Sequence, residues 1–341
     1  MNANGSGLAG FQPVFAQTMV RVKDPVKTED FYVNKLGMRR LASLDFPDSK
    51  ESTYLFAYSD EEGPDPASSN PEKSAWLSSR PYPMVECRHR WRTESDEGFA
   101  YHNGNSDPRG FGHMGLTIND IHEACANLEE AGVKIVRKPG PFKDVGSIAF
   151  CADPDNYWIE LIERDEKAAG PSAGLIGPDP VYAQTMIRVK DPQKSVAFYE
   201  QLGMKMINKF DFPDLTFSLF FLAYTEDEID GSTSQADRAR WLWSRRYPTL
   251  ELTYNYGTEK DPNFQHHNGN TEPLGFGYVG VVVDNVRQVT ESLKGVGTPI
   301  IREPASSTDA APLAFVADPD GYWVGLTSRT GAAPAQAYMK P

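Results

Sequence analysis

Residues 102–115 read His-Asn-Gly-Asn-Ser-Asp-Pro-Arg-Gly-Phe-Gly-His-Met-Gly, and residues 267–280 read His-Asn-Gly-Asn-Thr-Glu-Pro-Leu-Gly-Phe-Gly-Tyr-Val-Gly. The two stretches share one frame, but two positions change in kind between them. Arg109 of the first stretch corresponds to Leu274 of the second, and His113 corresponds to Tyr278. The chain is therefore a duplication in which one copy has lost groups that could do chemistry.

The duplication extends well beyond this stretch. Residues 16–25, Ala-Gln-Thr-Met-Val-Arg-Val-Lys-Asp-Pro, return as residues 183–192 with a single substitution. The two stretches are 167 residues apart, and a period this long indicates a duplicated domain and not a solenoid of short units. Within each copy the order of strand, helix and several strands occurs twice, which predicts four βαβββ modules.

Local signals mark the first helix of each copy and two long loops. Asp24, which precedes a proline, is expected to cap a helix that ends at Gly37, and the second copy repeats this plan from Asp191. Two segments rich in Asp, Glu, Ser, Pro and Gly, residues 59–74 and 225–238, are predicted to be polar loops.

Shifts in composition divide the chain into five parts. The predicted parts are a flexible N-terminal tail at residues 1–10, a first half at 11–165, a linker at 166–180, a second half at 181–328 and a C-terminal tail at 329–341. The linker is rich in Ala, Gly, Pro and Ser, which is typical of a connection between folded units.

The composition is that of a soluble globular protein. Of 341 residues, 40% are hydrophobic and 24% are charged, and no apolar run reaches the roughly 18 residues that a membrane helix needs. The net charge of -13 argues against nucleic acid as a partner. The three cysteines, Cys87, Cys125 and Cys151, are widely spaced, which fits a reducing compartment such as the cytoplasm and no disulfide framework.

Four positions in each copy could hold a metal ion. In the first copy they are Gln17, Glu86, His113 and Glu160, and in the second they are Gln184, Glu251, Tyr278 and Gly325. An amide oxygen, two carboxylates and an imidazole suit a divalent metal and leave room for water or substrate. Taken singly, Gln17 reads as an ordinary strand residue and His113 as a core histidine. A half-buried Glu160 is harder to explain without a partner for its charge.

The repeated motifs resemble those of a known enzyme family. They are Gln-Thr-Met-x-Arg-Val-Lys-Asp-Pro, Glu-Leu-Thr-x-Asn, His-Asn-Gly-Asn-x-x-Pro-x-Gly-Phe-Gly-His and Asp-Pro-Asp-x-Tyr-Trp-Ile-Glu, spread over residues 11–328. Each motif alone is weak, but together they resemble glyoxalase I (lactoylglutathione lyase) of the vicinal oxygen chelate superfamily. The two-domain eukaryotic form is the most similar, in which one chain carries both halves of a site-forming pair.

The resemblance implies an α+β fold with curved mixed sheets in two tandem glyoxalase-like halves, in one chain that works as a monomer in the cytoplasm. It also implies a substrate, the hemithioacetal of glutathione and a 2-oxoaldehyde such as methylglyoxal. The family isomerises this adduct to S-D-lactoylglutathione through a metal-stabilised enediolate, with a glutamate as base. The metal is expected to be Zn²⁺, and Ni²⁺ or Co²⁺ would suit the same ligands.

The family also implies which residues share a site, because each site takes Gln and the first Glu from one half and His and the last Glu from the other. The complete metal site is then Gln184, Glu251, His113 and Glu160, with Glu160 as principal base and Glu251 as ligand and base for the other hemithioacetal isomer. The second set is Gln17, Glu86, Tyr278 and Gly325, which lacks the imidazole and the base. Pairing within one half would instead join Gln17 and Glu86 to His113 and Glu160.

The glutathione contacts of the family agree with the crossed sets. Carried over by motif, they correspond to Arg188, Asn255 and Arg109, with Arg137 and Lys143 as looser matches. On the other side the Asn position is Arg90 and the Arg position is Leu274. Metal ligands and substrate contacts are thus lost together, which predicts one working and one degenerate site.

Two functions from other classes remain as alternatives. Iron-dependent dioxygenases of the superfamily use two His and one carboxylate, whereas Gln184 occupies the first-strand position here. Non-enzymatic small-molecule binders of the superfamily need no metal, so a complete set of four ligands argues against them.

Overall fold

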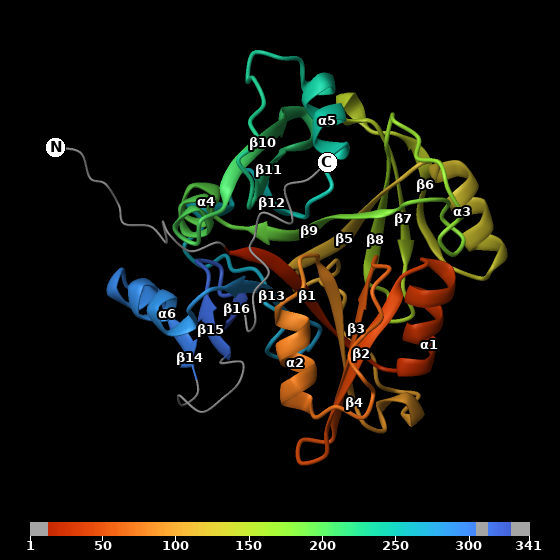
Figure 1. Ribbon diagram of the computed structural model, residues 1–341. Helices are drawn as coiled ribbons and strands as arrows, with labels where there is room; N and C mark the ends of the chain where they lie inside the picture. The colour runs from red at the N-terminus through yellow and green to blue at the C-terminus, as the bar shows by residue number, and fades with distance from the viewer. Residues whose placement is uncertain (1–12, 305–312, 329–341) are drawn as a thin grey trace.

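The computed structural model describes residues 13–304 and 313–328 as two curved, mixed sheets of eight strands each (Figure 1). The tails predicted at residues 1–10 and 329–341 lie outside the described residues. Within the described part of the chain, no helix is both long and apolar enough to cross a membrane.

Each sheet joins one module of the first half to one module of the second half. The strand orders are β14-β15-β16-β13-β1-β4-β3-β2 and β10-β11-β12-β9-β5-β8-β7-β6. The first sheet contains β1 (Val14–Val22), β2 (Arg39–Phe46), β3 (Glu51–Ala57), β4 (Met84–Arg90), β13 (Phe276–Val283), β14 (Ile300–Arg302), β15 (Leu313–Ala317) and β16 (Trp323–Ser328). The second contains β5 (Phe111–Ile118), β6 (Ile135–Pro141), β7 (Ser147–Ala152), β8 (Trp158–Glu163), β9 (Val181–Val189), β10 (Lys205–Phe212), β11 (Phe217–Ala223) and β12 (Thr249–Asn255). The four predicted modules are confirmed, and both halves contribute to both sheets.

A helix follows the first strand of each module, and the two predicted from Asp24 and Asp191 lie where their capping signals place them. These helices are α1 (Pro25–Glu29), continued by the π-helix η1 (Asp30–Lys35), α3 (Ile121–Glu130), α4 (Pro192–Gln201) and α6 (Val286–Gly295). In Figure 1, α1 and α3 lie on one side of the molecule and α4 and α6 on the other. The Asp24 carboxylate accepts hydrogen bonds from the N–H groups of Val26 and Lys27, and Asp191 caps α4 in the same way. Gly37 follows with φ +75°, as a helix end requires.

Two further helices correct the prediction of polar loops. α2 (Asn70–Ser78) begins inside residues 59–74, and α5 (Gln235–Trp243) begins inside residues 225–238. Ser69 forms a capping box with Glu72, and Ser234 caps α5 through its side chain. Part of the Ser-rich, acidic composition is therefore helix-capping chemistry. The remaining short elements are the 3₁₀ turns η2 (Thr93–Ser95), η3 (Lys143–Val145), η4 (Pro213–Leu215) and η5 (Thr258–Lys260).

The two His-Asn-Gly-Asn stretches cross each other and join the halves. The backbone N–H of His102 donates to the opposite stretch at 2.7 Å, and that of His267 donates to Arg109 O at 2.8 Å. Gly110 and Gly275 lie at these crossings, where an added Cβ would come within 1.8 and 1.9 Å of the carbonyl oxygens of His267 and His102. Glycine permits this close approach of two backbones.

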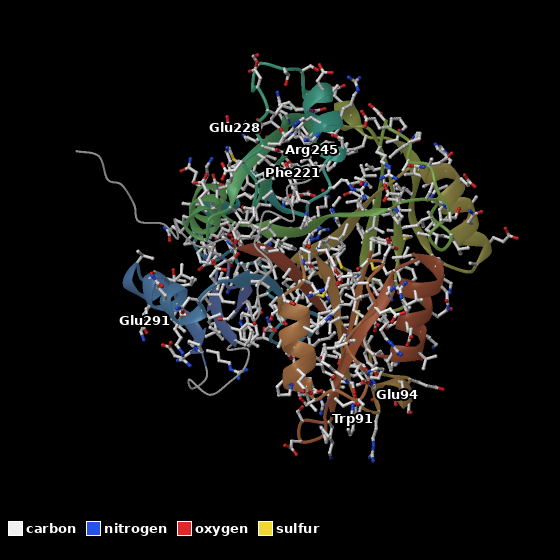
Figure 2. All side chains as sticks on the ribbon, in the orientation of Figure 1. Trp91, Glu94, Phe221, Glu228, Arg245 and Glu291 are labelled. Carbon is white, nitrogen blue, oxygen red and sulfur yellow. The ribbon has the colours of Figure 1, made fainter. Side chains whose placement is uncertain are left out.

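The largest core cluster draws on both sheets, and side chains from both halves meet at its centre. Phe111 of β5 stacks on Phe276 of β13 at 4.8 Å. Thr18 Oγ1 of β1 hydrogen bonds to Thr185 Oγ1 of β9 at 2.6 Å, and both residues are fully buried. Figure 2 shows how densely side chains fill the space within the fold, with charged groups such as Glu291 at its outer edge. The two halves therefore share one core.

Gly110→Ala is expected to lower the free energy of unfolding by about 1–3 kcal/mol or more, because its Cβ would overlap the His267 carbonyl. Urea denaturation followed by tryptophan fluorescence measures the change. Gly140→Ala is the matched control, since a Cβ there meets nothing within 4 Å. Equal stability of the two variants would contradict this account of the crossing.

Candidate active site

Four side chains from the two halves meet on the face of the second sheet against which α5 also packs. Gln184 comes from β9, Glu251 from β12, His113 from β5 and Glu160 from β8. Gly115 lies opposite both Gln184 and Glu160 in the strand register. A Cβ on Gly115 would come within 2.4 Å of Gln184 Cγ, so the glycine leaves room for the Gln184 side chain to reach the other three groups.

The polar ends of these side chains lie within or close to hydrogen-bonding distance of one another. Gln184 Nε2 is 2.7 Å from Glu160 Oε2, 2.6 Å from Glu251 Oε2 and 3.1 Å from His113 Nε2. His113 Nε2 is also 3.0 Å from Glu160 Oε2 and 3.4 Å from Glu251 Oε2. No member of the cluster is more than 7% exposed, so it is largely withdrawn from bulk water.

The donor set fits a divalent metal ion. Glu160, Glu251 and His113 offer three ligand atoms within 4.8 Å of one another. Gln184 Oε1 is buried and has no hydrogen-bond partner among the described residues, while Nε2 of the same amide points at the other three groups. Amide O and N are assigned from their surroundings, so a half-turn brings the oxygen to the cluster as a fourth ligand. Two carboxylates, an imidazole and an amide oxygen suit such an ion.

The electrostatics of the cluster also favour a bound cation. Burial lowers the pKa of His113, but the carboxylates of Glu160 and Glu251 outweigh burial and raise this pKa to about 9. Burial raises the pKa of Glu160, against the opposing effect of His113. Protons can thus supply the positive charge that two buried carboxylates require. A metal ion replaces such protons, so metal binding is expected to release them.

The corresponding positions of the first sheet form a different cluster. Tyr278 Oη donates to Glu86 Oε2 at 2.5 Å, and Arg88 Nη2 donates to Glu86 Oε1 at 3.1 Å. Glu86 is 4% exposed, and both oxygens of this buried carboxylate are satisfied by protein groups. Gln17 lies opposite Gly280, as Gln184 lies opposite Gly115 in the other sheet.

Gly325 contributes space to this second cluster. A Cβ on Gly325 would come within 3.1 Å of both the Tyr278 ring and the Phe315 ring. These two rings pack edge to face, with their centres 5.1 Å apart. A glutamate in place of Gly325 would have to displace Tyr278, so the two differences between the copies depend on each other.

The side chains expected to contact glutathione have different surroundings. Arg109 and Asn255 are exposed. Lys143 pairs with Asp214 at 2.6 Å. Arg137 donates to two backbone oxygens of its own hairpin, at 2.7 and 3.2 Å. Arg109 and Asn255 are therefore the two whose side chains are presented most openly to a ligand.

Arg188 has a structural task that the sequence does not reveal. Its guanidinium donates to three backbone oxygens of residues 104–111 and to Asn105 Oδ1. Arg21 makes the equivalent bonds in the other half. Arg188 therefore braces the repeated stretch beside the site, and its contact with glutathione stays a prediction.

One difference between the copies escapes a search for ligands. Two residues after the strand glutamate, the second half has Thr253 and the first half has Arg88. Thr253 Oγ1 donates to Glu251 Oε1 at 3.3 Å, whereas Arg88 brings a full positive charge to Glu86. The signal is visible in the repeat as Glu-x-Thr against Glu-x-Arg, and strand parity places each residue beside its glutamate.

Two hollows, of about 290 and 480 Å³, lie beside α5 and are not lined by the four-residue cluster. Asp165, Arg240 and Trp243 line both. Arg240 pairs with Asp165 at 3.2 Å, so these two charged groups, which line both hollows, already have a partner.

The sequence is similar to those of known glyoxalases. The Glyoxalase/Bleomycin resistance protein/Dioxygenase superfamily matches residues 14–161 and 182–326. A lactoylglutathione lyase of Schizosaccharomyces pombe is 38% identical over 309 residues, which cover 90% of this chain and 93% of the relative. Glyoxalase I of Saccharomyces cerevisiae is 35% identical over 311 residues, which cover 89% of each protein.

The fold gives the same answer. The crystal structure of glyoxalase I from Zea mays is similar with a TM-score of 0.68 and 26% sequence identity, over 94% of each chain. Both comparisons extend through both halves. The chain therefore belongs to the glyoxalase I (lactoylglutathione lyase) family of the glyoxalase superfamily.

Proposed function

We propose that the chain catalyses the glyoxalase I reaction at a single site, formed by Gln184, Glu251, His113 and Glu160. The substrate is the hemithioacetal of glutathione and methylglyoxal, and the product is S-D-lactoylglutathione. The observation that carries the proposal is the buried cluster in which two carboxylates, an imidazole and an amide with an unpaired oxygen converge.

The proton transfer falls to the carboxylates of this cluster. Glu160 removes the proton from the carbon that bears sulfur and returns it to the neighbouring carbon. Burial raises the pKa of Glu160, which moves it toward the working pH, where a general base is most effective. Glu251 is suited to the same task for the other hemithioacetal isomer. When bound, a divalent ion acts as a Lewis acid that stabilises negative charge on the substrate oxygens.

The proposal extends to the metal, the oligomeric state and the compartment. The ion is Zn²⁺ in this proposal, and Ni²⁺ or Co²⁺ are alternatives that the same ligands accept. The protein works as a monomer, because one chain already supplies both contributions to the site. Its three buried, unpaired cysteines fit the reducing cytoplasm.

The second cluster, made of Gln17, Glu86, Tyr278 and Gly325, does not turn over substrate in this proposal. It offers no imidazole and only one carboxylate. Both oxygens of that carboxylate already accept hydrogen bonds, from Tyr278 and from Arg88. A substrate at this cluster would therefore meet no free base.

Glutathione is captured at the rim of the four-residue cluster by Arg109, Asn255 and Arg188. Local cations matter here, because a protein with net charge -13 repels an anionic substrate elsewhere. Burial lowers the pKa of Arg188, and the nearby charge of Arg109 adds to this effect, so two cations share the rim. Arg137 and Lys143 are the looser candidates for the same substrate.

Glu160→Gln and Glu251→Gln are each expected to lower kcat/KM by about 10²–10⁴-fold, because each keeps the shape of the residue but removes a base and a charge. Glu86→Gln should leave the activity of the folded protein nearly unchanged. Hemithioacetal isomerisation and metal content are measured on all three variants. An inactive, metal-free Glu86→Gln beside an active Glu251→Gln would overturn the assignment of the working site.

The purified protein is expected to hold one tightly bound divalent ion per chain, and removal of that ion by a chelator should remove the activity. Elemental analysis by mass spectrometry gives the stoichiometry. Two ions per chain, both displaced or perturbed by an active-site inhibitor, would refute a single working site.

Arg109→Leu copies the residue of the second half and should weaken substrate capture while the metal stays bound. Charge-assisted contacts contribute about 1.5–3 kcal/mol, which corresponds to a loss of roughly 10–150-fold in kcat/KM. Arg90→Leu is the matched control and should have no effect, because Arg90 lies beside the second cluster at the position that corresponds to Asn255. Unchanged kinetics of Arg109→Leu would remove this residue from the site.

A further inference from the structure

The position two residues after the strand glutamate differs in charge between the working cluster, which contains Glu251, and the second cluster, which contains Glu86. It is Thr253 in β12 and Arg88 in β4. Side chains two residues apart on a strand share a face, so each lies beside its glutamate. Thr253 Oγ1 is 3.3 Å from Glu251 Oε1, and Arg88 Nη2 is 3.1 Å from Glu86 Oε1.

The two clusters therefore reach charge balance by different means. In the working cluster, Glu251 and Glu160 bring two carboxylates to one imidazole, and Thr253 adds no charge. In the second cluster, the Glu86 carboxylate faces the Arg88 guanidinium, which cannot lose its proton in a protein. A dication placed against Glu86 would lie within a few ångströms of Arg88. Like charges at that separation repel strongly where burial limits screening.

We propose that the Arg88 guanidinium takes the place of a metal ion in the second cluster by supplying positive charge to Glu86. The uncharged Thr253 leaves the working cluster able to bind an ion. This inference rests on the proposed function, which places a metal at the four-residue cluster. It adds a determinant outside the four ligand positions. The absence of His and Glu at positions 278 and 325 removes ligands, whereas Arg88 removes the need for an ion and repels it.

The substitute also takes over the structural task of a ligand set. Glu86 belongs to the first module and Tyr278 to the fourth, and β1 lies between their strands. The hydrogen bond from Tyr278 to Glu86 therefore spans the junction of the two halves. Arg88 holds Glu86 in place as the acceptor of that bond. A metal held by four strands of the other sheet would join the same kinds of module.

Thr253→Arg tests the inference in the otherwise intact enzyme. It places a guanidinium beside Glu251 while all four ligands remain, and bound Zn²⁺ is expected to fall from one ion per chain to almost none. Thr253→Met, which has a long uncharged side chain, is the matched control and should retain the ion. Circular dichroism verifies that both variants are folded. Retention of Zn²⁺ by Thr253→Arg, or its equal loss from Thr253→Met, would overturn the role assigned to charge.

A reciprocal set of substitutions tests the second cluster. Tyr278→His combined with Gly325→Glu restores the missing ligand types, and this double variant is expected to bind no more Zn²⁺ than the native chain. Adding Arg88→Thr should raise the content from one ion per chain to two. A second ion in the double variant, or no second ion in a folded triple variant, would overturn the proposal.

A native protein that binds no divalent ion and isomerises no hemithioacetal would refute the proposed function. The step in Zn²⁺ content between the double and triple variants concerns Arg88 alone. If the triple variant does not fold, the Thr253→Arg and Thr253→Met pair still decides the question.

Discussion

Antiparallel pairing of strands from opposite halves is the constraint on which the site depends. β5 of the first half pairs with β9 of the second, and this seam brings His113 and Glu160 to Gln184 and Glu251. The crossing stretches at Gly110 and Gly275 secure the seam where backbone meets backbone. A single half would contain neither a complete sheet nor a complete cluster. With both halves in one chain, the two seams can differ, because a change in one repeat alters each seam in a different way.

The range of each interaction decides what the sequence can predict. The caps at Asp24 and Asp191 are predictable because a cap depends on its next few residues. The four modules follow from the repeat, and the crossed sets follow from the resemblance to a family, since no local rule says which half supplies the facing strand. α2 and α5 escape prediction because their Ser-rich, acidic starts are also typical of loops. The bracing role of Arg188 depends on contacts that only the fold creates.

The two clusters differ in how they compensate the charge of their buried carboxylates. An ionised carboxylate withdrawn from water is costly unless a positive charge and hydrogen bonds compensate for it. In the cluster of the second sheet, Glu160 and Glu251 raise the pKa of His113 against the effect of burial, and two carboxylates face a single imidazole, which favours a divalent ion. In the cluster of the first sheet, both oxygens of the Glu86 carboxylate accept hydrogen bonds, one from Arg88 and one from Tyr278.

Loss of a metal site is therefore a problem of repacking as well as of missing ligands. Without compensating groups Glu86 would be a buried, unpaired charge, so a tyrosine in place of the imidazole is tolerable because it supplies another donor. Tyr278 supplies that donor, Arg88 supplies the charge, and Gly325 supplies the space that the Tyr278 ring needs. The cluster of the second sheet has the opposite requirement, since a bulky or charged neighbour beside its glutamates would fill the space that a metal ion would need. The same few positions thus set both the stability of each seam and its capacity for chemistry.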